Sequence, residues 1–195
     1  IYVDTGAMYR SIGLYAVRAG VDPHDADAVA ALLPQVKLGI RLIDGAQHIY
    51  LNGEDVSTAI RTEEVGMAAS AVGANPAVRA FLLEMQRNLA RTHDVIMDGR
   101  DIGTVVLPQA DLKIFLTASV EERARRRCRE LQARGAQVDL ATIQAEIAQR
   151  DYADSHRSAA PLRKAADAVV VDTSQMDREE SLAALITLAK ERLGL

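Results

Sequence analysis

The sequence is poor in residues that whole classes of protein need. Among 195 residues there are one cysteine, no tryptophan and 4% aromatic residues. The single cysteine, Cys128, excludes an internal disulfide framework and a zinc site built from several cysteines. No apolar run approaches the roughly 18 residues that a membrane-spanning helix requires, so we expect a cytoplasmic protein with no membrane partner.

Metal-ligand spacing is also missing from the histidines. The four of them lie far apart in the sequence, at His24, His48, His93 and His156. We therefore predict no metal site formed by protein side chains. The net charge of −4 argues weakly against a general nucleic-acid partner. Nothing in the sequence favours oligomerisation, and we expect a monomer.

What the sequence does contain is typical of a globular domain. Hydrophobic residues make up 49% and charged residues 26%, and the length fits one domain, residues 1–195. Short β-branched runs predict strands at residues 1–3, 95–97, 112–116 and 169–171. Helical periodicity predicts helices at residues 7–19, 25–33, 62–72, 75–91, 119–134, 139–157 and 178–193. Because strands and helices alternate, the expected class is α/β with a mainly parallel sheet, in which residues 95–97 form a buried strand.

One segment departs from this alternation. Residues 36–42 and 48–51 have the period of two that is typical of strands, and Asp44-Gly45 between them is a hairpin signal. Asn52-Gly53 marks a second turn. The segment therefore predicts a small antiparallel insertion.

Two strand ends carry unusual polar residues, and ligands of open parallel sheets bind at such ends. After residues 1–3 come a helix start that Asp4 or Thr5 would cap and, one turn on, Arg10. Backbone N–H groups, the helix dipole and a guanidinium together suit a phosphate. A capped helix with a surface arginine explains the same residues, and taken alone it is the better explanation.

The second strand end reads Asp98-Gly99-Arg100-Asp101-Ile102-Gly103-Thr104. Glycine lets the backbone approach a ligand closely. A turn needs glycine, but it does not need three charges beside it. Here we favour a functional interpretation over turn chemistry.

Two helices carry further charges. Arg150, Asp154 and Arg157 share one helical face, as phosphate ligands or as an exposed ladder of ion pairs. The other helix starts with a capping box of Ser119 and Glu122 and has five arginines within seven residues. The usual explanation for so many arginines is a solvated helix. The more specific explanation is an arm that faces phosphates.

The 195 residues contain no Gly-x-x-x-x-Gly-Lys-Ser/Thr loop, because none of the four lysines follows a glycine. The chain begins inside an apolar run and without methionine. We therefore expect that a strand, a nucleotide-binding loop and a helix precede Ile1 in the intact protein.

Together these segments resemble the bacterial cytidylate kinases, a branch of the nucleoside monophosphate kinases. The matching segments are residues 4–10, 53–62, 98–106 and 146–161. The resemblance implies a P-loop-kinase sheet, an acceptor-binding insertion at about residues 36–92, and a helical lid with its flanking helices at about residues 119–160. It also implies the reaction, in which ATP with Mg²⁺ phosphorylates CMP or dCMP to CDP or dCDP.

The resemblance further implies roles for residues on the acceptor side. Thr5 and Arg10 would hold the acceptor nucleotide near its phosphate. Ser70, Arg79 and Asp101 would read the cytosine edge. A carboxylate accepts from the exocyclic amine of cytosine but repels the carbonyl of uracil, so UMP should bind more weakly.

Other implied roles concern ribose, phosphates and ATP. Asp154 would bind ribose hydroxyls, and the lid arginines Arg126 and Arg127 would meet ATP. Phosphates would be clamped by Arg100, Arg150 and Arg157. Asp98 either orients Mg²⁺ through water or caps the turn that follows it.

Other functions stay open on the sequence alone. They are a kinase for another monophosphate such as UMP, a non-catalytic nucleotide-binding domain, and a nucleic-acid-binding protein that uses the arginine-rich helix. Without its donor loop, we expect the 195-residue chain itself to be inactive.

Overall fold

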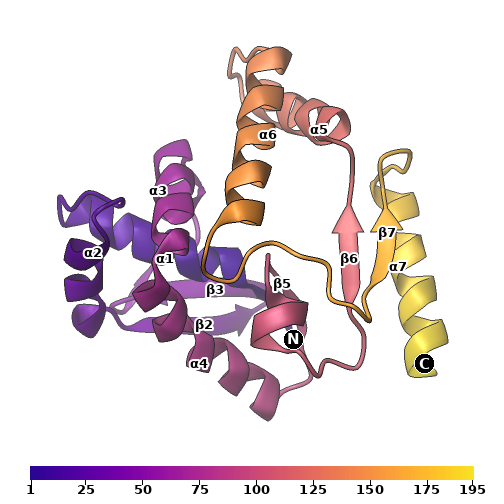
Figure 1. The fold of residues 1–195 in the computed structure, drawn as a ribbon, viewed down its shortest axis with the longest axis horizontal. Helices are drawn as coiled ribbons and strands as arrows, with labels where there is room; N and C mark the ends of the chain where they lie inside the picture. Colours follow the sequence, from indigo (N-terminus) through magenta and orange to yellow (C-terminus); the bar gives the residue numbers. More distant parts are fainter. The chain divides into compact units, whose positions relative to one another are not determined.

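The computed structural model describes all residues, 1–195, and divides them into two compact units at residues 1–102 and 103–195. Parallel strands, a small antiparallel sheet and flanking helices confirm the α/β class (Figure 1). The parallel strands form two separate two-stranded sheets, β1–β5 in the first unit and β6–β7 in the second. None of the helices is both long enough and apolar enough to cross a membrane.

In the first unit, β1 (Tyr2–Asp4) pairs in parallel with β5 (Ile96–Asp98), and Asp4 lies opposite Asp98. The strand predicted at residues 95–97 is confirmed, but its burial is only partial. Val95 and Met97 pack partly buried against the core, whereas the Ile96 side chain is 74% exposed. In a two-stranded sheet, alternate side chains point to opposite faces, and within this unit the face with Ile96 is not covered.

Helix α1 (Thr5–Arg18) begins directly at the end of β1 and is capped by Asp4 rather than Thr5. Its buried face includes Met8 and Ile12 and packs on α3 (Glu63–Ala74). The two helices come so close that a Cβ at Gly13 would lie 2.9 Å from the Ala69 backbone nitrogen. This packing fixes the start of α1, and with it the polar residues around β1.

The other helices of this unit begin at residues whose side chains accept from the first turn, as the sequence predicts. Asp25 caps α2 (Ala26–Leu32), Thr62 caps α3, and Asn75 caps α4 (Pro76–Thr92). Two short 3₁₀ helices, η1 and η2, complete the helical part, at Leu33–Gln35 and Ala59–Arg61.

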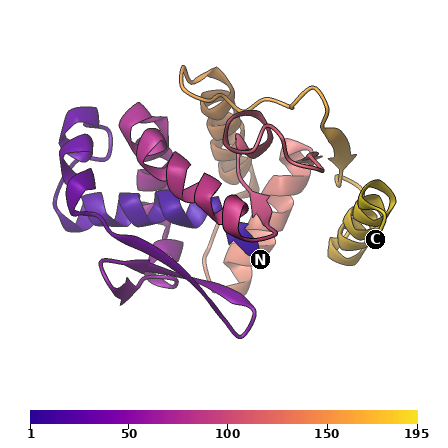
Figure 2. The ribbon, with the colours of Figure 1, turned by 90° about the horizontal axis from the view of Figure 1, so that it is seen from below.

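The predicted antiparallel insertion is confirmed as a three-stranded sheet (Figure 2). It consists of β2, β3 and β4, at Leu38–Ile43, Ala46–Leu51 and Glu54–Asp55. Both predicted turns have the left-handed backbone that asparagine, aspartate and glycine tolerate, with φ of 51° and 76° at Asp44-Gly45 and 50° and 91° at Asn52-Gly53. Ile49 and Leu51 of β3 belong to the same hydrophobic core as α1.

The second unit contains β6 (Ile114–Thr117) and β7 (Val169–Asp172), which pair in parallel. Its helices are α5, α6 and α7, at Val120–Ala133, Leu140–His156 and Arg178–Leu193, and α5 packs on α6. A π-helical turn, η3 (Ile102–Val106), lies where the two units meet along the chain.

Half of the predicted capping box of α5 forms. The Ser119 hydroxyl accepts from the Glu122 N–H at 3.2 Å. The Glu122 carboxylate accepts from Arg126 Nε at 3.0 Å instead of returning to the cap. The complete capping box of this chain is at α7, where Asp177 and Glu180 accept from each other's backbone N–H.

Candidate functional site

The carboxyl ends of β1 and β5 are tied together by side chains. The Thr5 hydroxyl is buried and donates to the Asp98 carbonyl at 2.7 Å. A Cβ at Gly99 would collide with this hydroxyl and with the Ile102 side chain. Gly99 therefore makes room for the side chains of Thr5 and Ile102, whereas the predicted approach of the backbone to a ligand stays a prediction.

Asp4 holds Arg10 at the start of α1. One of its carboxylate oxygens accepts from the Ala7 N–H at 3.0 Å, and the other from Arg10 Nη2 at 2.5 Å. Gly6 lies beneath the guanidinium, and a Cβ there would be 3.0 Å from Arg10 Nη1. The result is a partly buried arginine at a helix N-terminus, where both the dipole and the side chain attract an anion.

Asp98 has an unfavourable environment for a charged carboxylate. Partial desolvation, together with the nearby charge of Asp4, raises the pKa of Asp98, although a hydrogen bond from the Tyr2 hydroxyl opposes this. Burial and the same carboxylate raise the pKa of Tyr2 to about 12. Tyr2, Asp4 and Asp98 lie on one face of the strand pair, because they alternate in its register.

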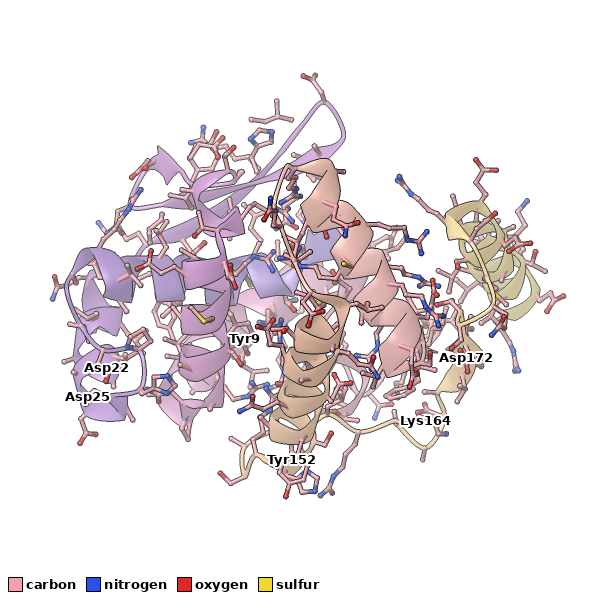
Figure 3. The ribbon with its side chains drawn as sticks, turned by 90° about the horizontal axis from the view of Figure 1, so that it is seen from above. Tyr9, Asp22, Asp25, Tyr152, Lys164 and Asp172 are labelled. Carbon is pink, nitrogen blue, oxygen red and sulfur yellow. The ribbon has the colours of Figure 1, made fainter.

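Arg79 and Asp101 form an ion pair in the interior, with side chains 11% and 8% exposed. Arg79 Nη1 also donates to the Gly73 carbonyl at 2.8 Å, at the end of α3. The guanidinium lies 5.5 Å from the ring centre of Tyr9, labelled in Figure 3. Two charges held in this way present a donor and an acceptor in a fixed orientation, which suits recognition of a planar base edge.

Two further predicted residues of this unit, Ser70 and Arg100, are exposed. Ser70 is on α3, one turn before Gly73, and Arg100 directly precedes Asp101. The first unit therefore holds seven of the twelve predicted site residues, namely Thr5, Arg10, Ser70, Arg79, Asp98, Arg100 and Asp101.

On α6, the alternative of an exposed ladder of ion pairs is wrong for Asp154 and Arg157. Both side chains are 12% exposed and make an ion pair at 3.4 Å. Arg157 Nε donates to the Ala160 carbonyl at 2.9 Å, and the Leu162 N–H donates to the Asp154 carbonyl at 2.8 Å. The pair thus anchors the segment after α6. Arg150 lies on the exposed surface of the same helix.

The five arginines of α5 all have carboxylate partners. Glu122 pairs with Arg125, Arg126 and Arg129; Arg123 pairs with Asp151 and Arg127 with Glu130. Four of the five arginines thus pair within α5, and Arg123 pairs with Asp151 of α6. The density of arginine alone therefore does not indicate a phosphate-facing arm.

Arg126 differs from its neighbours because it also holds backbone. Its Nη2 donates to the Thr173 carbonyl at 2.5 Å and to the Met176 carbonyl at 3.0 Å. The three residues line a cavity of about 670 Å³ within the second unit, together with Arg129 and Arg178. Arg127 is not among the lining residues. Of the two predicted ATP contacts, Arg126 is the one beside a cavity.

No three acidic, histidine or cysteine side chains of the chain are grouped so that they would hold a metal ion. Mg²⁺ that travels with a nucleotide needs only one or two carboxylates, because phosphates and water supply its other ligands. Asp98, a carboxylate at a strand end with Asp4 opposite it, fits such a limited contribution.

Three contributors to the site were not predicted. Tyr2 has a detectable signal, since it lies two residues before Asp4 on a strand and must share its face. Tyr9 and Gln47 have none, because their contacts depend on how α3, α4 and the antiparallel sheet pack around α1. Gln47 on β3 hydrogen-bonds the Asp4 backbone through both atoms of its amide.

Comparison with known proteins identifies the family of the chain. The family model described as cytidylate kinase matches residues 1–191. A cytidylate kinase of Geobacillus thermodenitrificans is 49% identical over 194 residues, which cover 100% of this chain and 87% of the relative. Those of Mycobacterium leprae and Geobacter sulfurreducens are 49% and 46% identical, with 99% and 98% of this chain covered and 85% and 82% of the relatives.

The family match also bears on the predicted segment before Ile1. It spans residues 1–191 and lends no support to that prediction, which stays a prediction. The match extends over nearly the whole chain and includes both units. The chain belongs to the cytidylate kinase family.

Proposed function

We propose that this protein transfers a phosphoryl group from ATP to CMP and dCMP. The observation that carries the proposal is the buried pair of Arg79 and Asp101, which presents hydrogen-bonding groups of both kinds from a rigid environment. Phosphoryl transfer needs little covalent help and depends mainly on positioning and on charge neutralisation. The residues of the chain supply both.

The base is read by donor and acceptor. The exocyclic amine of cytosine donates to the Asp101 carboxylate, and the ring acceptors of cytosine receive from Arg79, with Ser70 at the same edge. A uracil carbonyl facing Asp101 would meet like charge, so UMP is the poorer acceptor. Because Arg79 already has bonds to Asp101 and Gly73, little side-chain ordering is left for the moment of binding.

The acceptor phosphate lies at the start of α1. Arg10 neutralises it there, and Thr5 and Arg100 border the same strand ends. Mg²⁺, carried with ATP, supplies charge neutralisation to the phosphates when bound, and Asp98 would contact it through water. The raised pKa of Asp98 means that its ionised form is disfavoured, and a nearby cation would stabilise that form.

The second unit contributes residues for both nucleotides. Asp154 binds ribose hydroxyls of the acceptor, Arg150 and Arg157 clamp phosphates, and Arg126 and Arg127 meet ATP. In this arrangement residues 36–92 form the acceptor-binding insertion and residues 119–160 the lid. Arginines that approach only when both substrates are bound exclude water and limit ATP hydrolysis.

The 195 residues contain no Gly-x-x-x-x-Gly-Lys-Ser/Thr sequence, so the acceptor can bind even where turnover is absent. The test therefore measures binding and turnover separately. CMP, dCMP, UMP and AMP are titrated into the chain by calorimetry, and ADP release is measured with each acceptor plus ATP and Mg²⁺. We expect CMP and dCMP to bind at least about tenfold more tightly than UMP, the discrimination that one well-placed polar contact gives. Equal binding of UMP, or none of CMP, would contradict the proposal.

A further inference from the structure

The backbone of Asp4 is held by a side chain from the antiparallel sheet. The Asp4 N–H donates to Gln47 Oε1 at 2.8 Å, and Gln47 Nε2 donates to the Asp4 carbonyl at 3.4 Å. Gln47 thus bonds both the N–H and the carbonyl of Asp4, as the backbone of a neighbouring strand can do. The two residues are 43 positions apart in the sequence. Gln47 therefore fixes where β1 ends.

The side chain of Asp4 in turn holds Arg10. With Oδ1 engaged by the Ala7 N–H, the carboxylate cannot rotate freely, and Oδ2 receives Arg10 Nη2 at 2.5 Å. Both charged side chains are mostly buried, 24% exposed for Arg10 and 17% for Asp4. Gly6 makes room for this pair, because a Cβ there would lie 3.0 Å from both Arg10 Nη1 and Asp4 Oδ1. Gln47, Asp4 and Arg10 thus form a continuous chain of contacts within the first unit.

On the basis of the proposed CMP site, we infer that Gln47 is a positioning residue that acts through Asp4 to aim Arg10 at the acceptor phosphate. Arg10 has five N–H donors, and its contact with Asp4 occupies one nitrogen. The guanidinium is thereby oriented, and its Nε is buried without a hydrogen-bond partner. An arginine held in this way loses less side-chain freedom on binding an anion than a mobile one.

Three variants test this chain of contacts. Gln47→Met keeps the length of the side chain and removes both hydrogen bonds. Asp4→Asn keeps the helix cap and removes the charge that holds Arg10. Gln35→Met is the matched control, a glutamine of the same unit whose side chain contacts the Tyr15 hydroxyl at 3.4 Å and not β1.

Binding of CMP is compared with binding of cytidine, which lacks the phosphate. We expect Gln47→Met to weaken CMP binding about threefold to tenfold, the effect of losing one or two hydrogen bonds. The affinity for cytidine should change less than about twofold. Asp4→Asn should weaken CMP about tenfold or more, since a charged contact is lost. Added to Asp4→Asn, Gln47→Met should cost less than about twofold more, because it acts through Asp4.

The outcomes are distinct. Wild-type protein that ignores CMP would overturn the proposed function and this inference together. Wild-type protein that binds CMP while Gln47→Met behaves like Gln35→Met overturns the inference alone. Equal weakening of CMP and cytidine would mean that Gln47 merely supports the fold. Tighter CMP binding by Asp4→Asn would show that Asp4 competes with the phosphate instead of aiming Arg10.

Discussion

Charged side chains are paired differently in the two units of the chain. In the first unit, Arg79 and Asp101 are buried together and meet α3 and Tyr9. On α5 of the second unit, arginines pair with carboxylates of the helix surface, such as Arg127 with Glu130, 42% and 45% exposed. A buried pair is costly to break, whereas an exposed pair is worth about 0–1 kcal/mol. We therefore expect the Arg79–Asp101 pair to keep its geometry before CMP binds. Replacing a carboxylate partner on α5 by a phosphate should cost little free energy.

The change with the largest expected effect breaks the buried pair. Asp101→Ala leaves the Arg79 charge without its carboxylate in the interior, which should cost about 3–5 kcal/mol of unfolding free energy. Urea unfolding measures this loss. Arg79→Met combined with Asp101→Leu should recover most of the stability without recovering CMP binding. An unfolding midpoint of Asp101→Ala equal to that of the wild type would show that the pair is not held as described.

Asp98 offers a test in which stability and activity move in opposite directions. Its pKa is raised in the folded state, so the ionised carboxylate destabilises the fold at pH values above that pKa. Asp98→Asn should therefore raise the unfolding free energy at pH 7. The gain should disappear below the pKa of the unfolded carboxyl, where the group is protonated in both states. Where turnover with CMP is measurable, it should fall about 10–100-fold, as for groups that act on a metal through water.

A loss of stability at pH 7 in Asp98→Asn would contradict this account. It would mean that the bonds of Asp98 to its neighbours outweigh its desolvation.

A smaller effect is expected where the second unit has its cavity. Arg126→Leu removes the bonds to the Thr173 and Met176 carbonyls and should weaken ATP binding about tenfold, while CMP binding stays within twofold. Calorimetric titration of each nucleotide measures both. Arg125→Gln is the control, since Arg125 is an exposed arginine of the same helix that pairs with Glu122 at 3.7 Å. Equal effects on ATP and CMP would remove the distinction between donor and acceptor sides.

The smallest effect belongs to an exposed pair. Arg134 and Glu130 lie 2.7 Å apart with side chains 59% and 45% exposed. Arg134→Gln should change the unfolding free energy by less than about 0.5 kcal/mol, and less still in high salt. A loss above about 2 kcal/mol in thermal unfolding would erase the contrast between surface and interior pairs.

Local signals account for what the sequence predicts well. Asp25, Thr62 and Asn75 cap helices where the sequence places helix starts, and Asp44-Gly45 forms the hairpin turn. These features depend on residues within a turn of one another. The two polar strand ends likewise lie side by side, because strands β1 and β5 pair in parallel.

Contacts between distant residues account for what it does not predict. Gln47 and Asp4 are 43 residues apart, so no period or spacing relates them. Arg79 and Asp101 are 22 residues apart, and only the family resemblance groups them in the sequence analysis. The burial of Asp154 depends on the path of the chain after α6, and the exposure of Ile96 on a sheet with two strands. Propensity and periodicity carry no information about such packing.

The most direct measurement is the ratio of CMP to UMP affinity in the wild type and in Asp101→Asn. Asparagine keeps the shape of the side chain and an oxygen for Arg79, while its amide N–H₂ can donate to the carbonyl of uracil. We predict that the wild type prefers CMP and that the preference falls at least about tenfold in the variant, with thermal unfolding confirming a folded protein. An unchanged preference would contradict the claim that the buried pair of the first unit reads the base.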